Sequence, residues 1–152
     1  MEDYFILTLN KMGYQTTKFD SYTEKFIRYA VETRGKGYSL ELGAGYGLVS
    51  KEIVENGGRM YCNDLEVKHL EVLEGLSSNQ LHIVGGDLFS LELPQNFFEA
   101  ILISRVIHFF TPEEVSLCLQ MLKAWLRPGG KLFITTETPY LSNWTKFIPI
   151  FE

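Results

Sequence analysis

The segment ELGAGYG, from Glu41 to Gly47, holds the residues with the clearest chemical potential in this 152-residue chain. Its glycines alternate at positions 43, 45 and 47, between an apolar stretch and a helical pattern. Glycine there permits a sharp turn and a close approach of the backbone to a ligand. The dinucleotide fingerprint G-x-G-x-x-G would need glycine where Leu48 stands, and Glu41 would repel a pyrophosphate. The segment favours a ligand with an ammonium or sulfonium group; the alternative is a glycine turn that binds nothing.

Two aspartates follow later strand-like stretches. Asp64 ends YCND, about twenty residues after the first glycine of the loop. Asp87 lies in GGDL, after the next apolar stretch. A carboxylate at the first of these positions can accept hydrogen bonds from both hydroxyls of a ribose. Each aspartate also has an alternative role that involves no ligand. Asp64 could cap a helix, and Asp87 could be an acid of a surface loop.

Three polar residues follow the fourth strand-like stretch: Ser104, Arg105 and His108. His108 can serve as a base near neutral pH, but its apolar neighbours also suit a histidine packed at the rim of the core. Arg105 can hold a carboxylate or phosphate of a substrate, or it can be a solvated charge at the end of a helix. The sequence leaves both pairs of interpretations open.

Strands and helices alternate along the chain, and this alternation predicts how the polar residues are positioned. The expected strands cover 38–42, 59–63, 81–85, 98–104 and 131–137. The expected helices begin at a Ser21–Glu24 capping box, cover 47–56 and 66–76, and run from Thr111-Pro112 to about residue 126. Residues 1–20 are a mixed lead-in, and 88–97 a loop or single helical turn. The pattern predicts a doubly wound, mainly parallel, Rossmann-like α/β sheet with helices on both faces and ligands at the carboxyl ends of its strands.

ELGAGYG resembles the first motif of class I S-adenosylmethionine-dependent methyltransferases. YCND, GGDL, FEAILISRVIHFF and LRPGGKLFITTE resemble later segments of that family in the correct order, over roughly residues 38–138. The resemblance implies that the chain binds S-adenosylmethionine and releases S-adenosylhomocysteine. It places the loop of Gly43, Ala44, Gly45 and Gly47 around the methionine part of the cofactor, with Ser104 nearby. It also places Glu41 at the amino group, directly or through water, Asp64 at the ribose, and Asp87 and Leu88 at the adenine. Leu65 is expected as a further cofactor contact.

The implied reaction is transfer of a methyl group by in-line displacement, which depends mostly on holding the two reactants in line. A base is needed only when the acceptor must lose a proton, so the catalytic residue stays open among His108, Arg105 and Ser104. We expect a small metabolite as acceptor. The region after the fourth strand lacks the motifs of DNA-methylating enzymes, and a net charge of −5 disfavours nucleic acid. No zinc-ligand spacing is present, so no metal is expected.

We expect one domain over residues 1–152, made of an N-terminal cap and helix (1–37), a core (38–138) and an apolar tail (139–152). The sheets of the resembled family end in an antiparallel hairpin of two further strands, which we expect this chain to lack. The tail is rich in large apolar residues, so we expect it to pack on the domain or to form a homodimer through itself or the sheet edge. An acidic start and the absence of a long apolar run predict a cytoplasmic protein without membrane contact.

Two other functions stay open at this point. One is a non-catalytic module that binds S-adenosylmethionine or a partner and has an incomplete sheet edge. The other, less favoured, is an NAD(P)-dependent oxidoreductase. The sequence indicates neither the acceptor nor the atom that is methylated.

Overall fold

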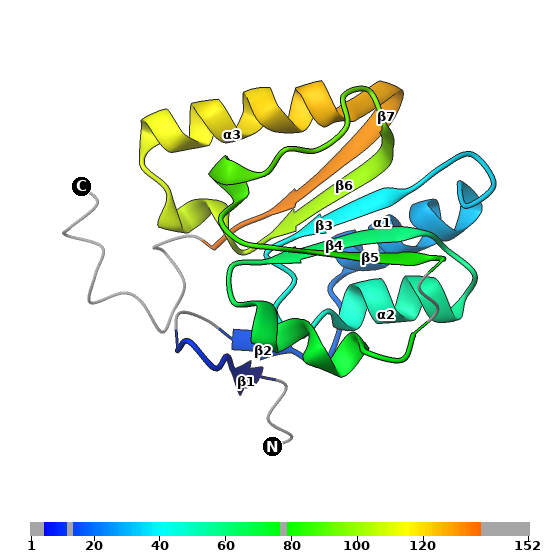
Figure 1. Ribbon diagram of the computed structural model, residues 1–152. Helices are drawn as coiled ribbons and strands as arrows, with labels where there is room; N and C mark the ends of the chain where they lie inside the picture. The colour runs from blue at the N-terminus through cyan, green and yellow to red at the C-terminus, as the bar shows by residue number, and fades with distance from the viewer. Residues whose placement is uncertain (1–4, 12–13, 77–78, 138–152) are drawn as a thin grey trace.

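The computed structural model describes residues 5–11, 14–76 and 79–137 (Figure 1). Its strands are β1 (Phe5–Leu7), β2 (Tyr14–Thr16), β3 (Ser39–Leu42), β4 (Met60–Asp64), β5 (Leu81–Gly85), β6 (Phe98–Ser104) and β7 (Leu126–Thr135). Its α-helices are α1 (Ser21–Glu32), α2 (Leu48–Glu55) and α3 (Pro112–Trp125). Three short 3₁₀ helices complete the elements: η1 (Val67–Leu73), η2 (Leu88–Ser90) and η3 (Ile107–Phe109). None of the helices in the described part of the chain has the length and apolar character that crossing a membrane requires.

Five parallel strands form the central sheet in the order β5-β4-β3-β6-β7. The chain builds outward from β3 to β5 and then crosses back to place β6 on the other side of β3. The strand order therefore reverses between β3 and β6, and ligands of open α/β sheets bind at the carboxyl ends of the strands at such a point. The predicted fold class is confirmed.

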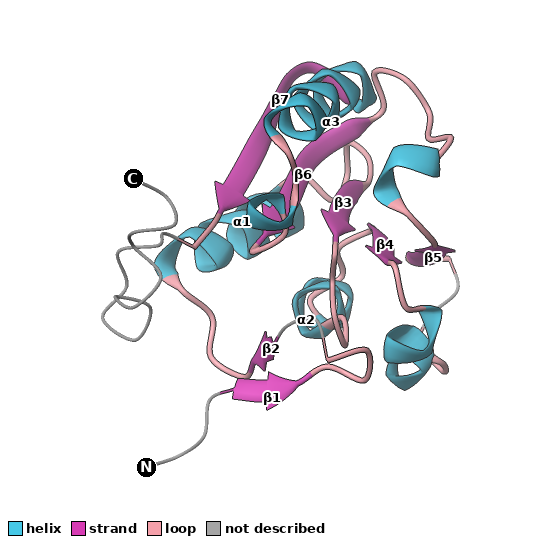
Figure 2. Cartoon of the chain, turned by 90° about the vertical axis from the view of Figure 1, so that its left-hand side faces the viewer, coloured by secondary structure: helices cyan, strands magenta, loops and turns pink. Residues whose placement is uncertain are grey.

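The sheet is covered on both faces, as its nearly continuous apolar strands require. Helix α3 lies on one face, and α1 and α2 lie on the other (Figures 1 and 2). Alternate residues of the central strands enter different cores, because side chains of a strand point to opposite faces in turn. Leu40 and Ile101 pack with Leu122 of α3, whereas Ala100 and Leu102 pack with Ile53 of α2.

The predicted strand 131–137 begins earlier and contains an irregularity. In the structure β7 starts at Leu126, which pairs with Phe98, and the regular ladder resumes where Lys131 pairs with Ala100. The intervening Pro128 has no N–H to donate, and Gly129 has a φ of 82°, so this part of the strand bulges. The turn that we expected ahead of the strand therefore lies within it.

The predicted helix 66–76 is a 3₁₀ helix over Val67–Leu73. The Asp64 carboxylate at the end of β4 accepts hydrogen bonds from the backbone N–H of Glu66 and from the side chain of His69. These bonds tie the first turn to the strand. The backbone N–H of His69 accordingly bonds to the carbonyl of Glu66, three residues earlier, as in a 3₁₀ helix.

Residues 5–16, expected as a mixed lead-in, contain an antiparallel hairpin of β1 and β2. It lies beside the carboxyl edge of the central sheet, below α2 in Figure 2. The sequence carried a signal for it, because two short stretches of apolar and β-branched residues flank Asn10 and Gly13, which favour turns. The expected tail 139–152 lies outside the described residues.

The predicted capping box of α1 is wrong, because the helix is capped by Asp20. The Asp20 carboxylate accepts hydrogen bonds from the backbone N–H groups of Tyr22 and Thr23, each at 2.9 Å. Burial raises the pKa of Asp20, but the hydrogen bonds from Thr23 and Tyr22 outweigh it, so the pKa lies below its ordinary value. The corresponding box at α3 is confirmed, with Thr111 and Glu114 bonded reciprocally.

The Asp20 cap gives a first testable prediction. Asp20→Ala should lower the free energy of unfolding by about 1 kcal/mol, because two backbone donors lose their acceptor. Ser21→Ala should change it by less than about 0.5 kcal/mol, since Ser21 is exposed and is not the cap. Urea unfolding of the two variants measures the difference, and equal losses would contradict the assignment.

Candidate functional site

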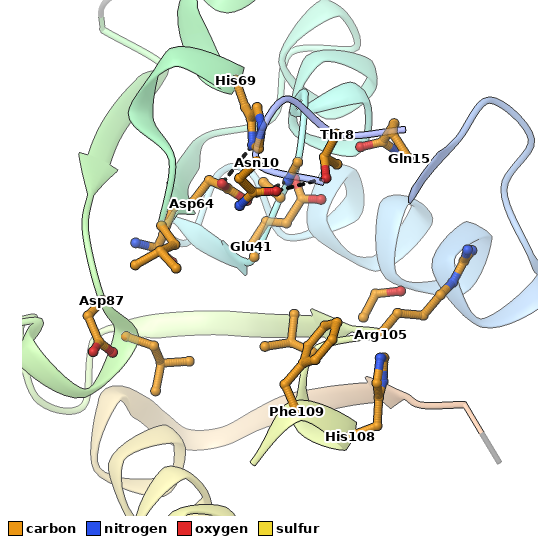
Figure 3. Close-up of a pocket in the computed structure, with 18 of the residues that line it drawn as sticks. Thr8, Asn10, Gln15, Glu41, Asp64, His69, Asp87, Arg105, His108 and Phe109 are labelled. Atoms are coloured by element: carbon orange, nitrogen blue, oxygen red, sulfur yellow. Dashed lines mark hydrogen bonds and ion pairs between the residues drawn. The ribbon is translucent and has the colours of Figure 1, made fainter. Parts of the chain in front are cut away.

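A cavity of about 950 Å³ lies at the carboxyl ends of the central strands. Figure 3 shows its polar lining from several elements. Asp64 and His69 lie with the hairpin residues Thr8 and Asn10 on one side, and Arg105 with His108 lies opposite. The volume is at the upper end of the 300–1,000 Å³ that is usual for small-molecule sites, so it has room for a cofactor together with a second small molecule.

The glycine loop between β3 and α2 forms one wall of this cavity. Gly43, Ala44 and Gly45 line it. Gly45 has a φ of 57°, and a Cβ added there would lie 2.6 Å from Oε1 of Gln15. The loop can therefore carry no side chain at this position while the hairpin lies against it.

Gly47 differs from the expectation of a cofactor contact. It is absent from the lining that the structure describes, and it caps α2 in a left-handed conformation with a φ of 71°. A Cβ there would lie 2.5 Å from the side chain of Leu73. Gly47 therefore shapes the loop and lets α2 pack closely against η1.

Glu41 lies at the base of the loop with only 5% of its surface exposed. Its Oε2 accepts hydrogen bonds from the Ser50 backbone N–H at 3.0 Å and from the Ser50 hydroxyl. Burial raises the pKa of Glu41 to about 7, against the effect of these hydrogen bonds, and the charge of Asp64 raises it further. A buried acid of this kind lines the cavity beside the glycine loop and favours a cationic ligand group.

The Asp64 side chain connects the end of β4 to the glycine loop and to η1. Its Oδ2 accepts a hydrogen bond from the Gly45 N–H at 2.8 Å. Its Oδ1 accepts from the Glu66 N–H and bonds to Nδ1 of His69, each at 2.9 Å. A carboxylate offers about four lone pairs, so these three bonds leave room for one more donor. The remaining acceptor lone pair of Asp64 lies on Oδ2, so the expected hydrogen bonds from ribose hydroxyls would go mainly to that oxygen.

The other residues expected to contact the cofactor after β4 and β5 are Leu65, Asp87 and Leu88. Leu65 lines the cavity with 55% of its surface exposed, and Leu88 lines it from a buried position. Asp87 is exposed and also lines the cavity, while its Oδ1 caps η2 by accepting from the Phe89 N–H at 2.9 Å. The structure therefore brings these three residues together and shows a capping role for Asp87 as well.

The opposite wall follows β6. Ser104 lines the cavity, and its hydroxyl pairs with that of Thr135 at 2.7 Å. Arg105 has a φ of 55°, unusual for a residue other than glycine, and its backbone N–H bonds to the Thr135 carbonyl. Its positive charge acts on Asp20 at the start of α1. Arg105 is thus held at the cavity edge by both its backbone and its charge.

His108 lies in η3 on the same wall. Its Nδ1 is buried and has no hydrogen-bond partner among the residues that the structure describes. Burial lowers the pKa of His108; the Glu137 carboxylate opposes this effect, and the Arg105 charge adds to it. The net direction is downward, so the ring is neutral near pH 7 and has a nitrogen lone pair to accept a proton.

Sequence reasoning did not select two parts of the lining. The hairpin contributes Leu7, Thr8, Asn10, Lys11 and Gln15. His69 is the second part; it lies in the segment 66–76, where no signal in the sequence distinguishes it as a site residue. Its selection required knowing that η1 turns this residue toward Asp64.

The fold and the site define an open α/β domain with a ligand-sized cavity at the switch point of its sheet. Residues 40–134 match the methyltransferase domain family, and the chain belongs to this family. The resemblance to a methyltransferase family read from the sequence is confirmed. The family assignment gives no support to the alternative that the chain is an NAD(P)-dependent oxidoreductase.

Individual relatives agree with this assignment. Chavicol O-methyltransferase of Ocimum basilicum is 35% identical over 96 residues, which cover 62% of this chain and 26% of that protein. Phosphoethanolamine N-methyltransferase 1 of Triticum aestivum is 27% identical over 100 residues, which cover 62% of this chain and 20% of that protein. The chain thus spans about a quarter of the length of these relatives or less.

Solved structures show the same fold. An S-adenosylmethionine-dependent methyltransferase of Mesorhizobium loti superimposes with a TM-score of 0.64 at 25% identity, over 78% of this chain and 54% of that one. The 1,6-didemethyltoxoflavin-N1-methyltransferase of Burkholderia thailandensis, solved with S-adenosylhomocysteine, gives 0.63 at 22% identity, over 75% and 51% of the two chains. The second likeness is evidence for the fold alone.

The burial of Glu41 gives a second testable prediction, on the pH dependence of stability. The folded protein holds a proton on Glu41 up to about pH 7, whereas the unfolded chain releases it near 4.5. The unfolded state therefore binds fewer protons in this window, and the free energy of unfolding falls as pH rises through it. Glu41→Gln keeps an acceptor for Ser50 and lacks this titration. From pH 5 to pH 8, the free energy of unfolding of the wild type should fall by up to about 3 kcal/mol more than that of Glu41→Gln. Urea unfolding of both proteins at each pH measures this difference.

A parallel pH dependence in the two proteins would contradict this account of Glu41. Glu55→Gln, an exposed change on α2, is the matched control and should follow the wild type.

Proposed function

We propose that this protein transfers a methyl group from S-adenosylmethionine to a small molecule bound in the same cavity. The observation that carries the proposal is the division of one cavity into two unlike walls. The glycine loop and three acids form one wall, and Ser104, Arg105 and His108 form the other. When bound, S-adenosylmethionine supplies a methyl group on a sulfonium that leaves as a neutral thioether.

The cofactor wall suits this group by charge and by shape. Glu41 and Asp64 offer carboxylates for an ammonium and a ribose, and Asp87 with Leu65 and Leu88 lies where an adenine would extend. Gly45 has no side chain, so the loop backbone lines the cavity while Gln15 of the hairpin packs against it. These residues support the proposed cofactor contacts. Gly47 contributes indirectly, because it shapes the loop and caps α2.

The acceptor wall suits a molecule that loses a proton as it is methylated. Neutral His108 can take that proton on a ring nitrogen, because no described partner of Nδ1 fixes the tautomer. Arg105 and Ser104 would orient the acceptor. Names of relatives with oxygen and nitrogen acceptors support both atom types, so we propose a small hydroxyl or amine compound.

Two expectations about the surroundings of the protein stay predictions. We propose a cytoplasmic protein, because its sequence has an acidic start and no long apolar run. We also propose that it does not act on nucleic acid, because its net charge is −5. The proposed homodimer depends on residues 139–152, which lie outside the described part of the chain, and on the edge of β7.

A binding experiment tests the cofactor wall. S-adenosylhomocysteine should bind in calorimetry, whereas NAD⁺ should not. Asp64→Ala should weaken binding of S-adenosylhomocysteine by about 1.5–3 kcal/mol, because a charged acceptor is lost. Glu55→Ala is the matched surface control. An unchanged dissociation constant in folded Asp64→Ala would refute the ribose assignment.

A turnover experiment tests the acceptor wall. Chavicol and phosphoethanolamine, named in the relatives, serve as probe acceptors with radiolabelled S-adenosylmethionine. With an accepted probe, His108→Gln should lower kcat by about 10²–10⁴-fold. The wild-type rate should fall on the acid side at a pH below the ordinary 6.5, since burial lowers the pKa of His108 and only the neutral ring is a base.

His82→Gln is the control, because His82 is exposed and outside the cavity lining. An acid limb that persists unchanged in His108→Gln would exclude His108 as the base. Binding of S-adenosylhomocysteine without turnover of any acceptor would favour the non-catalytic alternative.

A further inference from the structure

One imidazole joins the N-terminal hairpin to the carboxylate at the centre of the cofactor wall. The His69 side chain is only 1% exposed. Its Nδ1 lies 2.9 Å from Oδ1 of Asp64, and its Nε2 lies 3.0 Å from the backbone nitrogen of Leu9. We call this pair of hydrogen bonds the His69 bridge; its side chains are seen together in Figure 3.

The chemistry of the partners fixes where the proton of the ring lies. A backbone N–H can only donate, so Nε2 must accept the hydrogen bond from Leu9. The carboxylate can only accept, so Nδ1 must carry the proton that it donates to Asp64. The bridge therefore requires a neutral ring protonated on Nδ1, because a proton on Nε2 would face the N–H of Leu9.

The bridge continues into the glycine loop. Asp64 accepts on its other oxygen from the Gly45 N–H at 2.8 Å. An unbroken series of hydrogen bonds thus runs from the hairpin at Leu9, through His69 and Asp64, to the loop that we propose wraps the methionine part of the cofactor.

Tyr46 of the glycine loop makes a second set of contacts to the same hairpin. Its backbone N–H donates to Oε1 of Gln15 at 3.2 Å, and its hydroxyl donates to the Leu7 carbonyl at 3.3 Å. Its ring packs edge-on against the ring of His69, with centroids 5.2 Å apart. The hairpin is thereby placed along the cavity, where Leu7 and Gln15 contribute to the lining.

We propose that His69 is a positioning residue for cofactor binding: in its neutral Nδ1–H form it orients Asp64 and holds the N-terminal hairpin as a wall over the bound cofactor. This inference rests on the proposed function of the site. Its consequence is that the hairpin and the ribose-binding acid act as one unit, so that loss of either hydrogen bond weakens cofactor binding.

Two substitutions separate the two hydrogen bonds. The amide nitrogen of asparagine is attached at the same position as Nδ1, so His69→Asn retains a donor for Asp64 and removes the acceptor for Leu9. The amide oxygen of glutamine reaches the position of Nε2, so His69→Gln retains the acceptor for Leu9 and removes the donor for Asp64. His82→Asn and His82→Gln, at an exposed histidine outside the cavity lining, are the matched controls.

Nitrogen-15 NMR of the ligand-free wild type tests the bridge directly. His69 should show a protonated Nδ1 and an unprotonated Nε2 at neutral pH. A ring protonated on Nε2, or on both nitrogens, overturns the bridge. This measurement needs neither a variant nor a cofactor, so it separates failure of the bridge from failure of the proposed function.

Hydrogen exchange and calorimetry test the consequence. The Leu9 amide should exchange faster in His69→Asn than in the wild type and should stay protected in His69→Gln. Both variants should bind S-adenosylhomocysteine roughly tenfold more weakly, while the His82 controls bind as the wild type does. Wild-type affinity in either His69 variant overturns the positioning role.

Absence of S-adenosylhomocysteine binding to the wild type itself refutes the proposed function, and with it the role of His69 toward the cofactor.

Discussion

The Asp64 carboxylate is the contact on which the arrangement of the site depends. It lies at the end of β4 and accepts hydrogen bonds from the glycine loop, from the first turn of η1 and from His69. An acceptor with 8% of its surface exposed must have partners, because an unpaired buried charge is costly. Three donors of two separate segments, the glycine loop and η1, provide them. Parallel strand ends, glycine loop and hairpin are therefore held around one side chain.

The sequence predicts the part of this arrangement that follows from local rules. Strands 81–85 and 98–104 lie where apolar runs between turn residues place them, and the Thr111 box caps α3 as its spacing indicates. Asp64 and the glycine loop are predictable as a pair because parallel strands bring their carboxyl ends to one edge. These features depend on residues close in sequence or on the general topology of the sheet.

The features that the sequence did not predict depend on contacts between distant segments. His69 meets Leu9 across sixty positions, and Gln15 meets Tyr46 across thirty-one. Local periodicity indicates elements but not which distant elements meet, so neither contact can be predicted from the pattern of the hairpin or of η1 alone. The cap of α1 failed for a different reason: Asp20 and Ser21 are both good N-caps, and the choice between adjacent caps depends on how the chain enters the helix.

Under the proposed function, the two acids of the cofactor wall would let the site distinguish ligands by charge. Glu41 and Asp64 influence each other, and burial keeps Glu41 protonated up to about pH 7 without a ligand. A cationic group brought beside Glu41 favours its ionised form and offsets the cost of burying that charge. An anionic pyrophosphate would add to the repulsion instead. A buried acid that is expensive to ionise alone therefore selects for a ligand whose positive charge accompanies it, as the sulfonium and ammonium of S-adenosylmethionine do.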